Sequence, residues 1–311
     1  MTAKIVKQHY VSRALIARFS QDPRMKNGSV GQVDVSSGRV FPARPPGSVG
    51  FEHHFVKFDG DRMESLWATV ENPMTDVFVA LLRGQPESLR AMRPQVNDFV
   101  ALHFARSLEA QRIHADTLAE VEARTRANID LQTRLAELKY GLDLAKAPSI
   151  LQEMADAVLD PIQALEERGE PFQQWIEDVF QKTRTYLTNF SLSIRPAPIG
   201  TEYLLGDCPA IGIAPGMDPR RRPPLLDAKA LILPLTPRYA AMAYPSERGD
   251  PRFSVDVADA GFVASLNRAQ IALAHKRVFY RPGSGHEVTV RRYLGLDGSW
   301  RSADVNRTTP R

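Results

Sequence analysis

The sequence predicts an α+β protein in which long helices, mostly in the N-terminal two-thirds, pack against a mainly antiparallel sheet formed by an early hairpin and late strands. Three observations predict this class. Apolar residues recur every three or four positions over much of residues 60–184, which is the helical period. Short apolar runs bounded by turn residues follow after Thr185. Residues 31–40 alternate around a Ser-Ser-Gly turn, which is a hairpin signal.

The N-terminal elements are expected to be a short helix, the hairpin and a strand. Ser12 is a suitable cap for an amphipathic helix that ends near Asp22-Pro23. In the hairpin, Gly38 can take the positive φ that the turn needs. A short strand is expected over His54–Phe58.

Five helical segments are expected in the middle of the chain. The first runs from Arg62 to about Arg83 with a kink or break at Pro73, and the second from Val96 to His114. Residues 115–144 are rich in charge and in good helix formers, and predict a long, partly exposed helix or a helical hairpin. The last two are expected over 149–168 and 171–184.

The last part of the chain is expected to be rich in strands. Strands are predicted at 187–194, 202–205, 230–233, 239–244 and 278–280, with a helix at 257–275. If the early hairpin joins these strands in a single sheet, residues 1–284 form one domain. Its helical part is then about 60–184, and its sheet part about 30–58 and 185–284. A C-terminal strand and a polar tail are expected over 285–311.

Composition excludes several classes of protein. With 43% hydrophobic and 24% charged residues, 311 residues can bury a stable core. The single cysteine, Cys208, excludes an intramolecular disulfide and a multi-cysteine metal site. No signal peptide and no membrane-spanning run is recognised, so the cytoplasm is the expected compartment. The net charge of +4 does not indicate nucleic-acid binding, and the run Arg220–Arg222 is expected to be a solvated loop.

Short motifs spread over the chain resemble those of one family. Gln8-His9-Tyr10-Val11-Ser12-Arg13 resembles the His-Tyr-Val-Pro opening of the domain of unknown function 4238 family, and Glu64 and Glu71 resemble its paired helical glutamates. The other resemblances are of residues 100–107 to its Gln-x-x-Arg-Thr-Pro helix, 205–209 to its Ser-Asp-Asn-Pro turn, 233–237 to its Pro-Leu-Ser-Pro strand end, and Asn267 to a late helical asparagine. The resemblance implies no activity.

Four positions depart from the pattern of that family. Ser12 stands where proline is typical, and His103 where glutamine is frequent. Ser107-Leu108 replaces Thr-Pro, and Cys208 replaces asparagine. These departures fall beside the polar residues that are the best candidates for a site.

The candidate catalytic residues are His9, Glu71, Arg106 and Asp207, with Glu64, His103 and Asn267 as second-tier candidates. Glu64 and Glu71 are seven apart and share a helix face, and His103 and Arg106 are expected to share another. Antiparallel packing of the two helices would pair Glu71 with Arg106. Histidine can move protons, carboxylates can act as bases or hold a divalent metal, and arginine can hold a phosphate. The set suits a metal-assisted phosphodiesterase or a nuclease-like effector.

A structural reading explains the same residues. Glu71 and Arg106 would then form a buried pair that fixes helix packing, Asp207 would cap a turn, and His9 would anchor the N-terminus. Cys208 is not expected to be a nucleophile, because the carboxylate of Asp207 beside it disfavours the thiolate. The alternative function is a non-catalytic interaction module that binds a protein partner through residues 115–144. The metal and the substrate are left open.

Overall fold

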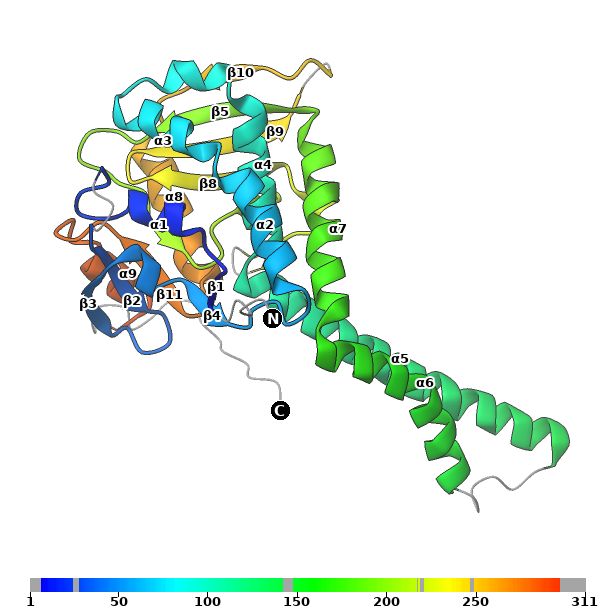
Figure 1. Ribbon diagram of the computed structural model, residues 1–311. Helices are drawn as coiled ribbons and strands as arrows, with labels where there is room; N and C mark the ends of the chain where they lie inside the picture. Colours follow the sequence, from blue (N-terminus) through cyan, green and yellow to red (C-terminus); the bar gives the residue numbers. More distant parts are fainter. Residues whose placement is uncertain are drawn as a thin grey trace.

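The structure is a computed structural model that describes residues 7–24, 28–141, 148–216, 218, 221–246 and 249–296. It confirms the α+β class, with helices that cover antiparallel-rich sheets (Figure 1). Within the described ranges, no helix combines the length and the apolar character that a membrane span needs.

The chain begins with strands and one short helix. β1 (Lys7–His9) pairs antiparallel with β4 (Phe51–His53), and α1 (Arg13–Arg18) lies between them in the sequence. The predicted hairpin is β2 (Val30–Asp34) with β3 (Val40–Arg44), and Gly38 in its turn has a φ of 65°. A 3₁₀ turn (Pro46–Ser48) precedes β4. The strand expected at 54–58 is wrong, because His54 adopts a left-handed φ of 57° and the strand ends before it.

A layer of helices follows. It consists of α2 (Gly60–Glu71), α3 (Met74–Leu82), a 3₁₀ turn (Pro86–Arg90), α4 (Arg93–Ala105) and, later in the chain, α7 (Glu170–Leu187). The expected break at Pro73 is confirmed, since α2 ends at Glu71 and α3 begins at Met74.

Two long helices form an arm that extends away from the body (Figure 1). They are α5 (Leu108–Tyr140) and α6 (Pro148–Arg168), so residues 115–141 belong to one side of a helical hairpin. Residues 142–144 of the expected segment lie outside the described residues. The single helix expected at 96–114 is wrong. Arg106 leaves the helix with φ −102° and ψ 85°, and the Ser107 side chain caps α5 by accepting a hydrogen bond from the Ala110 N–H at 3.1 Å.

The remaining chain supplies the sheets. Its elements are β5 (Phe190–Pro196), β6 (Leu205–Gly206), β7 (Ile211–Ile213), a 3₁₀ turn (Leu225–Asp227), β8 (Ala230–Thr236), β9 (Tyr239–Pro245), β10 (Phe253–Val255), α8 (Ala260–Leu273) and β11 (Arg277–Tyr280). One sheet has the order β10-β5-β9-β8-β7 and is antiparallel except between β10 and β5. A four-stranded sheet has the order β3-β2-β11-β6.

The early hairpin joins late strands, as expected. The expected single sheet is wrong, because the late strands are divided between two sheets. It pairs with β11, and β6 completes that sheet, while the other late strands form the five-stranded sheet. The chain changes sheets between β6 and β7. There the Asp207 carboxylate binds the backbone that leads into β11, and Pro209 has no N–H to donate to a ladder.

In residues 285–296, the described part of the C-terminal segment 285–311, the expected strand is wrong. Residues His286–Tyr293 form helix α9, and residues 297–311 lie outside the described residues. Val288, Thr289 and Val290 favour a strand. The helix prevails because Val290 is fully buried beside β2 and β11, and because Glu287 in the first turn and Arg291 in the last complement the helix dipole.

The main core lies between the helical layer and the five-stranded sheet. Successive side chains of β8 point to opposite faces. Leu231 and Leu233 pack with Phe99 of α4 in one core, whereas Ile232 packs with Leu266 of α8 in a second core. The five-stranded sheet is therefore the middle of three layers, with α8 on the face opposite α4.

Candidate functional site

Arg106 lies at the centre of a buried group of polar side chains. It follows the last residue of α4 and is 1% exposed. Its Nη2 pairs with Oε1 of Glu71, as expected from the sequence, and its guanidinium lies 4.3 Å from the centroid of the Trp67 ring. Trp67 and Glu71 are four residues apart on α2, so one helix face supplies both partners.

Glu64 lies on the same face of α2, three residues before Trp67. Burial raises the pKa of its carboxyl group, Arg106 acts against that rise and Glu71 adds to it. Glu64 and Glu71 are therefore both within the electrostatic reach of one guanidinium, which is the shared face that the sequence predicts.

His9 approaches the same guanidinium from β1. Its ring lies 5.8 Å from that of Phe51 on the paired strand. Burial and, to a smaller extent, the positive charges of Arg106, Lys7 and Arg13 together lower the pKa of His9 to about 4. The imidazole is therefore neutral near pH 7. We call His9, Glu64, Trp67, Glu71 and Arg106 the Arg106 cluster.

Four atoms of the Arg106 cluster are buried but have no hydrogen-bond partner among the described residues. They are His9 Nε2, Glu64 Oε1, Trp67 Nε1 and Arg106 Nε. Gln8 Nε2 and Ser12 Oγ, on either side of His9 in the sequence, are in the same condition. Buried polar atoms nearly always have partners, so a concentration of unpaired atoms marks a place that calls for a functional explanation.

His103 has partners for both of its ring nitrogens. Its Nδ1 lies 2.9 Å from the carbonyl oxygen of Phe99, and its Nε2 accepts a hydrogen bond from the Ser12 N–H at 3.3 Å. Burial and, to a smaller extent, the positive charge of Arg106 together lower the pKa of His103 to about 3. His103 and Arg106 were expected to share a helix face. This expectation is wrong, because Arg106 lies beyond the end of α4. The contacts of His103 are those of a neutral ring that holds α1 against α4.

Asp207 is fully buried and its carboxylate is occupied by the backbone. Oδ1 accepts from the His275 N–H at 2.8 Å, and Oδ2 accepts from the N–H groups of Lys276 at 2.5 Å and Arg277 at 2.7 Å. Burial raises the pKa of Asp207 and the three donors oppose that rise. These contacts are structural, but they differ from the local turn cap that the structural reading expects, because the donors lie 68 to 70 residues later in the chain.

Cys208 is buried beside this carboxylate. Its Sγ lies 3.7 Å from Oδ1 of Asp207. Burial raises the pKa of the thiol well above its usual value, and Asp207 raises it further. The expectation that the carboxylate disfavours a Cys208 thiolate is thus confirmed, although burial is the larger cause.

Asn267 and Gln270 of α8 clamp the segment that contains β6. Asn267 accepts from the Leu204 N–H and donates to the Glu202 carbonyl, both at 2.8 Å. Gln270 accepts from the Gly206 N–H at 2.6 Å and donates to the Pro209 carbonyl at 2.9 Å. Both side chains bind backbone, so their contacts are structural. Sequence reasoning missed Gln270, although its spacing of three from Asn267 places the two on one helix face.

Two further residues were missed or misjudged. Trp67 lies between Glu64 and Glu71 at helical spacing, which was the available signal for its place in the cluster. Arg222 is not part of a solvated loop, because its guanidinium lies 3.3 Å from the centroid of the Phe104 ring and its Nη1 is buried. Arg221 is exposed as expected, and Arg220 lies outside the described residues.

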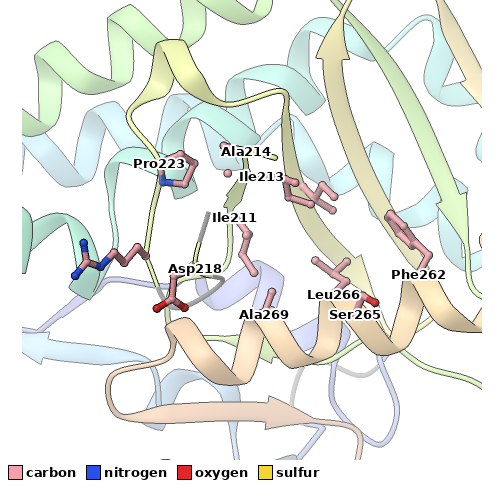
Figure 2. Close-up of a pocket in the computed structure, with 12 residues that line it drawn as sticks. Ile211, Ile213, Ala214, Asp218, Pro223, Phe262, Ser265, Leu266 and Ala269 are labelled. Carbon is pink, nitrogen blue, oxygen red and sulfur yellow. The ribbon is translucent and has the colours of Figure 1, made fainter. Parts of the chain in front are cut away.

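A cavity of about 210 Å³ lies away from the Arg106 cluster, between the five-stranded sheet and α8 (Figure 2). Its walls are mostly apolar and include Ile211, Ile232 and Leu266, with Asp218 on the loop that follows β7. Figure 2 shows no convergence of labelled polar side chains on it, so it does not serve as the candidate site.

Among the described residues, no group of three or more His, Cys, Asp or Glu side chains is placed to hold a metal ion. In the Arg106 cluster the two glutamates share the charge of one guanidinium instead.

Comparison with known proteins finds one family. The model described as "Protein of unknown function (DUF4238)" matches residues 7–284, which confirms the resemblance seen in the motifs. No curated protein and no solved structure matches the chain.

Proposed function

We propose that this chain, which belongs to the DUF4238 family, binds a phosphate ester at the Arg106 cluster and hydrolyses phosphodiesters in a nuclease-like reaction. The observation that carries the proposal is the group of four buried polar atoms in the Arg106 cluster that have no partner among the residues the structure describes. His103, Asp207 and Asn267 are instead satisfied by backbone groups. Side chains that only support the fold are expected to be satisfied in this way.

The polarity of the cluster favours an anionic ligand. Arg106 Nε and Trp67 Nε1 can only donate hydrogen bonds, and neither has an acceptor among the described residues. Besides burial, the positive charges of Arg106, Lys7 and Arg13 lower the pKa of His9. Guanidinium groups bind phosphate oxygens through charge-assisted hydrogen bonds, and an acceptor-rich anion would satisfy these donors.

The same residues can divide the work of hydrolysis. A bound phosphate would offset the positive charges around His9 and raise its pKa from about 4, which makes the neutral ring a better base. His9 Nε2 would take a proton from water as the water oxygen bonds to phosphorus. Burial favours the protonated form of Glu64, which would donate its proton to the leaving ester oxygen as the P–O bond breaks. Arg106 would stabilise the charge on the phosphoryl oxygens.

The experiment also tests whether the reaction is metal-assisted. The ligands available in the described residues do not make a group of three, so no step is assigned to a metal. Addition of Mg²⁺ or Mn²⁺, compared with EDTA, shows whether cleavage depends on a divalent cation.

The test compares the wild type with His9→Ala, Glu64→Gln and Trp67→Phe. Binding of inorganic phosphate is measured by calorimetry, and cleavage with bis(p-nitrophenyl) phosphate and with single-stranded DNA. Glu87→Gln, at an exposed glutamate, and Trp175→Phe are the matched controls. We expect His9→Ala to lose at least about 100-fold in the rate of cleavage of both substrates, with an unchanged circular dichroism spectrum. Glu64→Gln should lose as much with DNA and much less with bis(p-nitrophenyl) phosphate, because p-nitrophenolate leaves without a proton. Trp67→Phe should weaken phosphate binding, because it removes one donor and retains the ring under Arg106.

Two results would contradict the proposal. Wild-type protein that neither binds phosphate nor cleaves either substrate, with or without a metal, overturns it. So does an equal loss of cleavage in the control variants. If the three cluster variants lose only stability, the polar residues are structural and the chain acts as a non-catalytic module.

A further inference from the structure

Helix α5 exposes several large apolar side chains on the arm. Val121, Leu131, Leu135 and Leu138 are 44%, 54%, 49% and 83% exposed. Single exposed apolar residues are common on protein surfaces, but a row of them on one helix marks an interaction site.

This row points away from α6. The side of α5 that faces α6 is marked by Arg126, whose Nη1 lies 4.0 Å from Oδ1 of Asp156, and by the buried Thr133. Leu131 and Leu135 each lie two residues from Thr133, which is roughly 200° around the helix. Helix α5 therefore has one face covered by α6 and an opposite apolar face that α6 does not cover.

The exposed residues follow a heptad pattern. Val121, Asn128 and Leu135 are spaced by seven, and so are Arg124, Leu131 and Leu138, which begin three residues later. These are the a and d positions of a coiled coil. A stripe limited to a and d positions is the narrow seam that pairs with one other helix, whereas a helix that packs on a globular core has a wider apolar face. We call these six positions the α5 seam.

We propose that the α5 seam pairs with the α5 seam of a second copy of this chain, in antiparallel orientation. A two-fold axis between residues 129 and 130 places Val121 of one copy against Leu138 of the other. It also places Asn128 against Leu131, so each a position meets a d position. The arm extends away from the body, which leaves this face accessible to another molecule (Figure 1).

Charges beside the seam select the antiparallel orientation. In a parallel pair, Arg134 at a g position would meet Lys139 at the e position of the other copy, and the two cations repel. In the antiparallel pair these two residues lie on opposite flanks. The flank that carries Arg134 then also carries Glu120 of the second copy, with an axial offset of roughly 7.5 Å. The other flanking positions include the uncharged Thr125, Ala127 and Gln132, which cause no repulsion.

The pairing is expected to be concentration-dependent. Asn128 and Arg124 interrupt the seam, and Arg124 also pairs with Glu120 of its own helix at 2.5 Å. Polar residues at a and d positions lower stability while they specify the register. One helix pair also buries less area than most permanent interfaces.

The first test measures the mass of the full chain by sedimentation equilibrium over a range of concentrations. We expect a monomer–dimer equilibrium in the wild type. Leu131→Glu and Leu135→Glu should weaken dimerisation at least tenfold, whereas Ala123→Glu, an exposed position of α5 outside the seam, should not. Because the two leucines are already exposed, circular dichroism should show an unchanged helix content. A wild-type monomer at every concentration, or equal weakening by Ala123→Glu, overturns the proposal.

The second test fixes the orientation by disulfide formation. Val121 and Leu138 are 17 residues apart on one helix, roughly 25 Å, so cysteines at both positions cannot bridge within one chain. The native Cys208 is 5% exposed and should not interfere. Val121→Cys/Leu138→Cys should give a covalent dimer under oxidising conditions, and each single variant only traces. Strong cross-linking of Leu138→Cys alone would show a parallel pair and overturn the antiparallel arrangement. The tests use no phosphate, so their outcome is independent of the proposed hydrolase function.

Discussion

The N–H of Ser12 donates a hydrogen bond to Nε2 of His103 at 3.3 Å, and this bond joins the start of α1 to a residue 91 positions later in α4. The other ring nitrogen lies 2.9 Å from the Phe99 carbonyl. The ring can serve both contacts only when it is neutral, with its proton on Nδ1.

Stability is therefore expected to fall in mild acid. Burial and the positive charge of Arg106 together lower the pKa of His103 from 6.5 to about 3. Between these pH values the unfolded chain binds a proton that the folded chain does not bind, so the free energy of unfolding decreases as pH falls. The slope from this residue is about 1.4 kcal/mol per pH unit at most. Urea unfolding at pH 7.5, 6 and 5 measures it.

His103→Gln serves as the control for this slope. The glutamine side chain does not titrate, and its oxygen can accept the bond from Ser12. In the variant, the free energy of unfolding should therefore depend less steeply on pH, because the contribution of His103 is lost. The contribution of His9, whose pKa is also lowered, remains. An identical pH dependence in the variant and the wild type would contradict this prediction.

Asp207 is expected to contribute to stability rather than to cleavage. Asp207→Ala leaves three backbone N–H groups without an acceptor, at about 1–3 kcal/mol for each one that stays buried. Asp207→Asn retains one acceptor oxygen and should lose less. In thermal unfolding followed by circular dichroism, we expect the midpoint temperature to decrease in the order wild type, Asp207→Asn, Asp207→Ala. Loss of phosphodiester cleavage without loss of stability would instead place Asp207 in the active site.

Asn267 and Gln270 should each stabilise the turn between the two sheets. Each side chain makes two hydrogen bonds to backbone, so Asn267→Ala and Gln270→Ala should each lower the free energy of unfolding by about 2 kcal/mol. Arg268→Ala, on the same helix but hydrogen-bonded to the exposed Ser265, is the control and should change it by less than about 0.5 kcal/mol. Denaturant titration distinguishes these values, and a loss from Arg268→Ala as large as from the other two would refute the clamp.

Thr289→Ala tests whether residues 286–293 form a helix or a strand. Thr289 is exposed in α9, and alanine favours a helix over threonine by several tenths of a kcal/mol, whereas threonine is favoured in strands. We expect the variant to be slightly more stable than the wild type in thermal unfolding. A decrease in stability would favour a strand over residues 286–293.

Much of the fold could be predicted because its signals are local. The helical period around Pro73, the turn at Gly38 and the helix formers of α5 depend on neighbours within a few residues. The end of α4 was missed because Ser107 is a weak signal inside a continuous helical pattern. The same error placed His103 and Arg106 on one face.

The division of the late strands between the five-stranded and the four-stranded sheet could not be predicted, because strand pairing joins segments far apart in the chain. β2 pairs with β11 across more than 240 residues, and no local pattern distinguishes that partner from β9. The clamp that separates the sheets, at Asn267 and Gln270, likewise acts on backbone more than 50 residues away.

By itself the sequence determined the class of the fold, its family motifs and which polar side chains deserve testing. Only the tertiary structure decided which of those side chains are satisfied. Asp207 and His103 have hydrogen-bond partners, whereas His9, Glu64 and Arg106 each retain a buried atom with no partner in the described part of the chain. The reason is physical: a residue's type sets what it can donate or accept, but the partner comes from segments that only folding brings together.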